Sequence, residues 1–268
     1  MMKKLVSAPY LLWMAIFIIV PLIMVAYFAL TDTNGAFTLD NLAAVSQYSN
    51  IFIRSIWLAA VATVICLIIA YPLALILANT DKSYQSTVLM IVMLPMWMNF
   101  LLRTYAWMTL LGNNGLINSF FGLFGLGPFK MLNTSGAVVL GMVYNFLPFM
   151  VLPLYNALTK IDPNVINAAH DLGANWFQTF LRVIFPLSLP GVISGITMVF
   201  VPALTTFVIS NLLGGSKILL IGNVIEQEFT QASNWHLGSG LSIVLMVFIL
   251  INMLMTAIFD KNGEGTSL

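Results

Sequence analysis

The chain has very little charge. Only 7% of its 268 residues are Asp, Glu, Lys or Arg, whereas 60% are hydrophobic, and the mean hydropathy is +0.98. An average soluble domain carries roughly 25% charged residues, so this composition could not cover a water-facing surface. It predicts a membrane protein with several spans. The formal net charge of +1 also argues against nucleic acid as a partner, because nucleic-acid binding requires a basic face.

Cysteine and histidine are almost absent. A single cysteine, Cys66, excludes a disulfide within the chain and any multi-cysteine metal site. The two histidines, His170 and His236, are far apart in the sequence and form no cluster with metal-ligand spacing. We therefore expect no metal ion and no cofactor in this chain.

Long apolar runs make up most of the sequence. A helix needs about 20 mainly apolar residues to cross a bilayer, and six stretches reach that length, at residues 10–30, 55–78, 87–111, 136–158, 186–213 and 241–259. None of them alternates as the strands of an outer-membrane barrel do. The first run is too long for the core of a signal peptide. The sequence predicts an all-α membrane protein with six transmembrane helices in one domain, residues 1–268.

Positive charge is unevenly divided between the two sides of the membrane. Six spans place both termini on one side, which then carries six positive residues against three on the other: Lys3, Lys4, Lys82, Lys160, Arg182 and Lys261, against Arg54, Lys130 and Lys217. By the positive-inside rule, both termini are expected in the cytoplasm.

The longest connection on that side, residues 159–185, is expected to be ordered. Asp162 is a good N-cap and Pro163 suits a first helical position, so a helix is predicted over 163–172, with Gly173 ending it. A second helical run, 174–185, would lie at the membrane interface, and Pro186 would mark re-entry into the bilayer. On physical grounds alone, this segment fits either a docking element or a connector that rests on lipid.

The same segment resembles the EAA loop of ABC importer permeases. That family has Glu-Ala-Ala, three residues, Gly, nine residues and then Ile-x-Leu-Pro. The matching residues here are Ala168, Ala169, Gly173, Ile184 and Pro186. Asn167 stands in place of the usual Glu, and keeps polarity but not charge.

The resemblance extends from about residue 95 to the sixth span. Several stretches are similar to spermidine/putrescine permeases: residues 99–107, 114–118, 147–150, 152–155, 161–163, 214–217, 221–223 and 226–229. Permeases for other solutes share much of this pattern. An iron chelate, an oxyanion or a phosphonate therefore remains an alternative to a polyamine.

The resemblance implies a type I, MetI-like permease fold in the bacterial inner membrane. It implies four partners besides lipid: a cytoplasmic ABC ATPase dimer that binds ATP and Mg, a second related permease chain, an extracytoplasmic solute-binding protein, and the polyamine. The chain itself is not expected to be an enzyme, because Gly214-Gly215-Ser216-Lys217 lacks P-loop spacing. Coupling to the ATPase is assigned to one group of residues: Asn167, Ala168, Ala169, Asp171 and Gly173.

Polyamine handling requires carboxylates and aromatic faces, which attract ammonium groups. The candidates for a substrate path or a docking face are Asp32, Trp97, Tyr144, Glu226, Glu228 and Trp235. An ordinary solvated face, or helix packing for the aromatic residues, explains these positions at least as well.

Arg103 is a charge inside the third predicted span. Such a charge costs roughly 2.5–3.5 kcal/mol on insertion scales, so it needs a partner, a wet cavity or access to the surface. One interpretation has Arg103 extending to the outer interface beside Tyr105 and Trp107. The other places it near the solute path or at a contact between chains. Direct contact with a cationic solute is not expected, because the charges repel.

Two further classes of protein compete with the importer hypothesis. An ion-coupled secondary transporter needs carboxylates within the membrane or inverted repeats, and no Asp or Glu falls inside a predicted span. A membrane scaffold without transport activity would not need an ordered cytoplasmic segment and predicts no associated ATPase.

Overall fold

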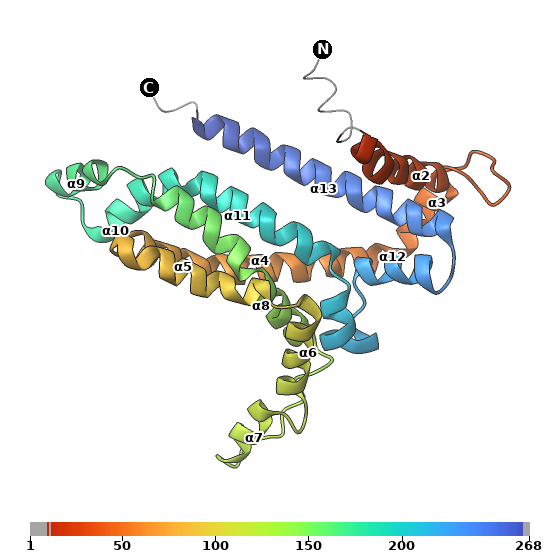
Figure 1. The fold of residues 1–268 in the computed structure, drawn as a ribbon, viewed down its shortest axis with the longest axis horizontal. Helices are drawn as coiled ribbons and strands as arrows, with labels where there is room; N and C mark the ends of the chain where they lie inside the picture. Colours follow the sequence, from red (N-terminus) through yellow and green to blue (C-terminus); the bar gives the residue numbers. More distant parts are fainter. Residues whose placement is uncertain (1–9, 11, 265–268) are drawn as a thin grey trace.

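Six apolar helical segments dominate the structure. The computed structural model describes residues 10 and 12–264 (Figure 1). Five helical runs are long and apolar enough to cross a membrane: Leu12–Ala29, Asp40–Ala78, Ser135–Leu158, Trp176–Thr205 and Trp235–Thr256. A sixth is a bent pair, Lys82–Trp97 with Phe100–Gly122. Across the described residues, one isolated β-bridge pairs Thr31 with Phe37. The predicted all-α architecture is confirmed, with one span broken.

The elements follow one another along the chain as η1 (Ala15–Ile19), α2 (Val20–Ala29), α3 (Asp40–Ala43), η2 (Ala44–Tyr48), α4 (Ser49–Ala78), α5 (Lys82–Trp97), α6 (Phe100–Leu111), α7 (Leu116–Gly122), α8 (Ser135–Leu158), α9 (Pro163–Asp171), α10 (Trp176–Thr179), η3 (Phe180–Ile184), α11 (Phe185–Thr205), η4 (Ser210–Gly214), η5 (Gly215–Lys217), α12 (Ile221–Thr230) and α13 (Trp235–Glu264).

Helices α4, α8 and α11 pack together at the centre of the molecule. Small, fully buried residues recur along α4 every three or four positions, at Ala59, Ala62, Cys66, Ala70 and Ala74. Small residues let helix backbones approach closely, which drives helix association where the solvent is itself apolar.

Helix α11 makes close contacts with both of its neighbours in this centre. A Cβ on Gly191 would lie 2.5 Å from the Cβ of Ala157 in α8, so only glycine fits that crossing. The hydroxyls of Tyr71 in α4 and Ser188 in α11 hydrogen-bond at 2.7 Å. These contacts fix α11 against both α8 and α4.

The third predicted span, 87–111, is not one helix. Helix α5 ends at Trp97, the backbone is extended at Met98 and Asn99, and α6 leaves at 88° to α5. Asn99 Oδ1 accepts the N–H groups of Leu101 and Leu102 at 2.9 and 3.3 Å. This N-cap starts a new helix and competes with continuation of the old one. The arm formed by α6 and α7 projects away from the bundle (Figure 1).

The fifth span also differs from the prediction of 186–213. Its helix begins at Trp176 and continues through Pro186 to Thr205. Pro186 removes a helix hydrogen bond, but the preceding turn, Phe180–Ile184, is widened into a π-helix, in which the N–H of Phe185 reaches the carbonyl of Phe180. The predicted run over 174–185 is thus continuous with the fifth apolar helix and is not separated from it at Pro186.

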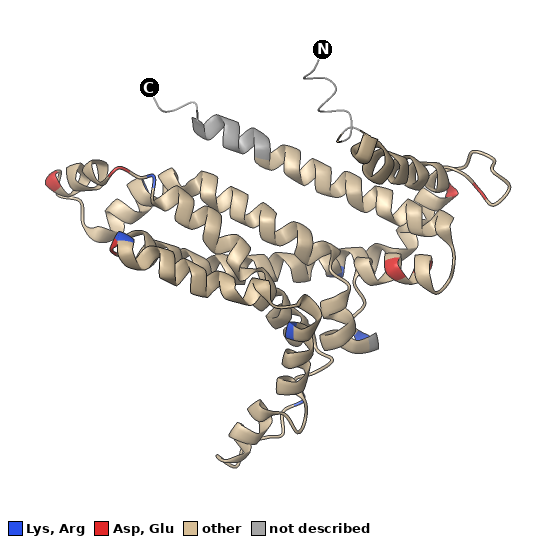
Figure 2. Cartoon of the chain, in the orientation of Figure 1, with Lys and Arg blue, Asp and Glu red and all other residues tan. Residues whose placement is uncertain are grey.

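Charged residues lie mainly at the two ends of the long helices. Figure 2 shows acidic and basic positions at both ends of the bundle, while the middles of the long helices carry none. Basic positions also occur on and near the α6–α7 arm. This distribution is the one expected when the middles of the long helices cross hydrocarbon.

Candidate functional site

Helix α9 lies at one end of the bundle, between α8 and α10 (Figure 1). The carboxylate of Asp162 accepts the N–H of Asn164 at 2.9 Å, and Pro163 occupies the first helical position. Both features satisfy the start of a helix, since an N-cap side chain pairs one of the free N–H groups and proline has none to pair. The predicted helix over 163–172 is confirmed to within one residue.

The end of α9 is equally well defined. Gly173 adopts φ +83°, a left-handed conformation that side chains other than glycine's rarely adopt. Its N–H donates to the carbonyl of His170 at 2.9 Å, and the N–H of Ala174 donates to the carbonyl of Ala169 at 3.0 Å. These two bonds form the Schellman motif that ends many helices. A short helix is thus capped at both ends.

The outward face of α9 is apolar. No residue of the helix is buried, and the Val165 and Leu172 side chains are 44% and 90% exposed. With Ala168 they follow the spacing i, i+3, i+7, which places them on one side of a helix. A nine-residue helix is marginal by itself, and a leucine this exposed gains nothing from its own chain. This surface therefore has the form of a docking element.

All five predicted coupling residues lie on α9 or directly after it. Asn167, Ala168, Asp171 and Gly173 are exposed, and Ala169 is half-buried. Asn167 and Asp171 are four residues apart, so they lie on the same side of the helix. The structure thus presents these residues together at one end of the molecule, and their coupling role remains a prediction.

A rigid connection joins α9 to the central helices. Asn175 and Gln178 form a reciprocal capping box that begins α10, with hydrogen bonds of 2.9 and 3.0 Å. The rings of Trp176 and Phe180 stack at 5.7 Å, and Phe180 meets Tyr71 of α4 edge-on at 5.6 Å. These contacts pack the segment that follows α9 against α4, where the same helical run continues as α11. Sequence reasoning missed this cap, although Asn-x-x-Gln was the signal for it.

Two of the candidate solute residues, Asp32 and Trp235, lie at the opposite end of the bundle. The carboxylate of Asp32 accepts the N–H groups of Ala36 and Asn34 at 2.8 and 2.9 Å, which lowers the pKa of that carboxyl below its usual value. Trp235 packs on Phe28 and Phe229, with ring centroids at 6.2 and 5.5 Å. It lines a cavity of about 680 Å³ between α2 and the start of α13.

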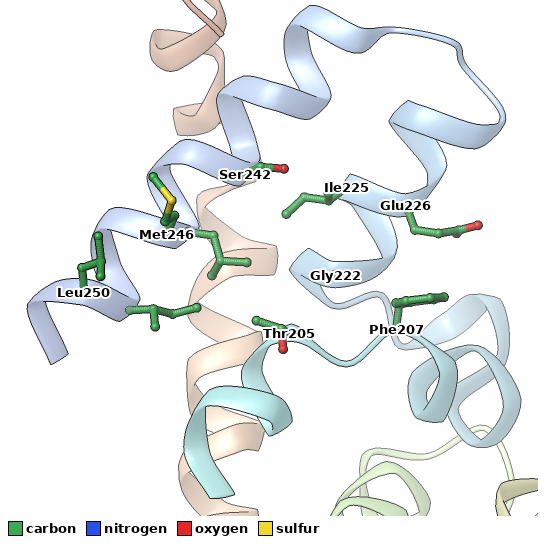
Figure 3. A pocket seen from close by; sticks show the side chains of 10 residues that line it. Thr205, Phe207, Gly222, Ile225, Glu226, Ser242, Met246 and Leu250 are labelled. Atoms are coloured by element: carbon green, nitrogen blue, oxygen red, sulfur yellow. The ribbon is translucent and has the colours of Figure 1, made fainter. Parts of the chain in front are cut away.

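Glu226 lines a different cavity, of about 540 Å³, between the end of α11, α12 and α13 (Figure 3). The cavity is mostly apolar. Ile225 points toward α13, whereas the carboxylate of Glu226 points away from it, alongside Phe207. Glu226 accepts a hydrogen bond from the Thr230 hydroxyl at 3.0 Å. Glu228 is half-buried on the same helix.

The remaining candidates lie on or against the two helices of the third span. Trp97 ends α5 and is 78% exposed. Tyr144 of α8 contacts Trp107 of α6 edge-on at 5.4 Å. The structure therefore does not gather the six candidates into one site, and the two cavities share no lining residue.

Arg103 does not extend to the surface. Its side chain is 7% exposed, and its Nε and Nη1 are enclosed without a hydrogen-bond partner among the described residues. The interpretation that it snorkels beside Tyr105 and Trp107 is therefore wrong. The bend at residues 98–99 redirects α6, so the side chain does not follow a straight span toward the outer interface.

Sequence reasoning also missed a buried polar network around Asn223. This fully buried side chain accepts the N–H of Leu220 at 2.9 Å and donates to the carbonyl of Phe207 at 3.0 Å. It also bonds the side chains of Ser210 and Asn211. The network holds α12 against the irregular segment that follows α11. Asn223 in an otherwise apolar stretch was the available signal.

Six segments long and apolar enough to cross a membrane, one of them a bent pair of helices, together with a capped helix exposed at one end, are the architecture of a transport permease. The model of the family "Binding-protein-dependent transport system inner membrane component" matches residues 70–262. The chain belongs to this family and is a multi-pass inner-membrane protein.

The relatives agree with this assignment. The chain is 38% identical to the spermidine/putrescine transport system permease protein PotB of Haemophilus influenzae over 259 residues, 93% of this chain and 91% of that protein. A chain of a bacterial alginate importer superposes with a TM-score of 0.78 at 20% identity, covering 97% of this chain and 95% of the other. A chain of the MetNI methionine transporter superposes with a TM-score of 0.60 at 16% sequence identity, covering 82% of this chain and 98% of the other. These two likenesses confirm the type I importer permease fold.

Proposed function

We propose that this chain is a membrane-spanning permease subunit of an ATP-driven importer for spermidine or putrescine. The observation that carries the proposal is the 38% identity to a spermidine/putrescine permease, which extends over 93% of the chain and leaves no long segment unmatched. As a permease, the chain provides the path for the solute and performs no chemistry on it.

Helix α9 is proposed to be the coupling helix. Its exposed apolar face, Val165, Ala168 and Leu172, would insert into a groove of a cytoplasmic ABC ATPase, and both termini would lie on the same side. The stacked connection from Trp176 through Phe180 to Tyr71 supports this role, because a lever must be stiff to move the helices that it joins. ATP and Mg would bind to the ATPase dimer.

The same proposal assigns two further protein partners. A second, related permease chain would complete the solute path, and an extracytoplasmic binding protein would deliver the polyamine. The end of the bundle that carries Asp32, Trp235, Glu226 and Glu228 lies opposite α9 and presents carboxylates and an aromatic ring, which suit either a cationic solute or the delivering protein.

The test is ATP hydrolysis by the complex that co-purifies with the tagged chain from native membranes, measured with and without spermidine and the binding protein. Hydrolysis that spermidine stimulates would support both the ATPase partnership and the solute class. ATP hydrolysis that polyamines do not change, but that an iron chelate, an oxyanion or a phosphonate stimulates, would assign that compound as the solute in place of a polyamine. A folded chain without associated hydrolysis would refute the importer proposal.

A further inference from the structure

Arg103 is a buried cation that has no counter-ion among the described residues. It sits one turn into α6, where its N–H bonds the carbonyl of Asn99 at 3.1 Å, and its side chain is 7% exposed. Nε and Nη1 are fully enclosed and have no hydrogen-bond partner among the described residues. A carboxylate from that part of the chain is therefore not within hydrogen-bond distance of either nitrogen.

The chain offers this charge little compensation. The guanidinium carbon lies 5.9 Å from the centre of the Phe100 ring, a cation–π contact. Such a contact is weak compared with the desolvation of a buried ion, which arginine normally offsets by pairing with a carboxylate. Figure 2 shows the acidic positions at the two ends of the bundle and none on the α6–α7 arm. The compensating group must therefore come from outside the described chain.

The surroundings of Arg103 indicate where that group enters. Nη2 is not one of the enclosed, unpaired atoms, so an acceptor can reach the guanidinium through it. Leu101, Leu102 and Tyr105, which flank Arg103 on α6, are 46%, 65% and 47% exposed. Helix α6 therefore combines an enclosed arginine with exposed apolar and aromatic side chains on its other sides, a composition typical of protein–protein interfaces.

We propose that Arg103 pairs with a carboxylate of a second permease chain that packs against α6. This inference rests on the proposed function, which supplies that chain. A polyamine cannot be the counter-ion because it carries the same sign of charge. A carboxylate on a side chain is narrow enough to enter beside Nη2, whereas a lipid phosphate carries its glycerol and two acyl chains with it.

The proposed pair predicts opposite effects of Arg103→Met in the single chain and in the assembled transporter. In the separately purified chain, Arg103→Met removes an uncompensated charge, so the melting temperature should rise or stay the same. In the assembled transporter, the same substitution leaves the partner's carboxylate unpaired, so retention of the second permease chain should fall by at least about 30-fold. Arg103→Lys keeps the charge but not the planar fork, and should retain the second chain to an intermediate degree.

The experiment co-expresses the tagged chain with the second permease chain of the same transporter and measures both quantities. Arg54→Met is the matched control, because Arg54 is exposed near the start of α4. Loss of the second chain in Arg103→Met alone, with an unchanged or higher melting temperature of the single chain, would support the pair. Arg103→Glu should also lose the second chain. The Asp-to-Arg or Glu-to-Arg change in the second chain that restores this complex would identify the carboxylate.

Three results would overturn the inference. The first is equal retention of the second chain by Arg103→Met and Arg54→Met. The second is a lower melting temperature of the single Arg103→Met chain, which would make Arg103 a packing residue of its own chain. The third is a higher melting temperature of the wild-type single chain in phosphatidylglycerol vesicles than in phosphatidylcholine vesicles, if Arg103→Met abolishes that difference. This result would make lipid phosphate the counter-ion. If no second permease chain co-purifies even with the wild type, the proposed function fails as well.

Discussion

Leu172 provides the sharpest test of the coupling proposal. Its side chain is 90% exposed in the isolated chain, at the end of α9, where it contributes almost nothing to folding. If α9 enters a groove of the ATPase, that surface becomes buried in the complex. Leu172→Ala should therefore weaken the complex and leave the stability of the permease unchanged.

The size of the effect follows from the three carbon atoms that Leu172→Ala removes. Burial is worth about 0.8 kcal/mol for each CH₂ group, so full burial of Leu172 in the groove contributes up to about 2.4 kcal/mol. At about 1.4 kcal/mol for each factor of ten, the ATPase should bind roughly 50-fold more weakly. The permease itself should change in stability by less than about 0.5 kcal/mol, the usual range for a surface substitution.

The assay reconstitutes the purified permease complex and titrates the ATPase subunit, following binding and spermidine-stimulated hydrolysis. The matched control is Leu123→Ala. Leu123 directly follows α7 on the projecting arm and is 82% exposed, so it undergoes the same chemical change at a similar exposure away from α9. The variant at Leu172 should lose binding and the variant at Leu123 should keep it.

Equal ATPase binding by the two variants would refute the docking role of α9. A clear drop in the melting temperature of Leu172→Ala would also contradict the reasoning, because it would show that Leu172 packs within the permease. Ala169→Arg and Gly173→Pro serve as stronger changes. The first places a charged side chain on the helix, and the second removes the N–H that donates to the carbonyl of His170.

Three further predictions concern stability. Asn223→Leu leaves the N–H of Leu220 without its acceptor and should destabilise the protein by at least about 2 kcal/mol in thermal unfolding. The control Asn113→Leu, at an exposed site, should have little effect. Equal melting temperatures of the two variants would contradict the buried network. Gly191→Ala should cost about 1–3 kcal/mol because its Cβ meets Ala157, whereas at Gly122 a Cβ meets nothing within 4 Å, so Gly122→Ala should be neutral or stabilising. The folded pKa of Asp32 is depressed, so the stabilisation from its bonds to the turn at residues 31–37 is complete above the unfolded pKa and is lost as the pH falls through the folded pKa. Asp32→Asn should therefore speed amide exchange in this turn at neutral pH and make no difference below the folded pKa. A difference that persists in acid would contradict this assignment.

Much of the fold could be read from the sequence because bilayer thickness sets the length of an apolar run. The fourth span, predicted at 136–158, forms at Ser135–Leu158, and the helix predicted at 163–172 forms at Pro163–Asp171. In both cases the local signals agree: an apolar run of the right length in the first, and an N-cap, a proline and a terminal glycine in the second. Here composition and capping determine the element without help from distant contacts.

The sequence failed where tertiary contacts decide between two local options. Residues 87–111 are mainly apolar, and hydropathy alone does not distinguish a straight span from two helices at 88°. The capping side chain of Asn99 was the local signal for the break. Pro186 looked like a helix start, but the π turn before it lets the helix continue. The six acidic and aromatic candidates lie apart in the single chain, because sequence distance does not fix which helix ends meet.

The break at residues 98–99 and the irregular segment after Thr205 lie on elements that pack against each other. Helix α6, which follows the break at residues 98–99, packs against η4, which follows the end of α11 at Thr205. Irregular backbone at membrane depth is tolerated only where protein or a water-filled cavity covers it. The Asn223 network covers the second break from within the chain by bonding the carbonyl of Phe207. Asn99 caps the first break by accepting two backbone N–H groups, but Trp97 and Met98 beside it are 78% and 57% exposed, and Nε and Nη1 of Arg103 have no hydrogen-bond partner among the described residues. We therefore expect the proposed second permease chain to pack on the side of the molecule that carries α6, where it would cover Trp97 and Met98 and supply a carboxylate to Arg103 together.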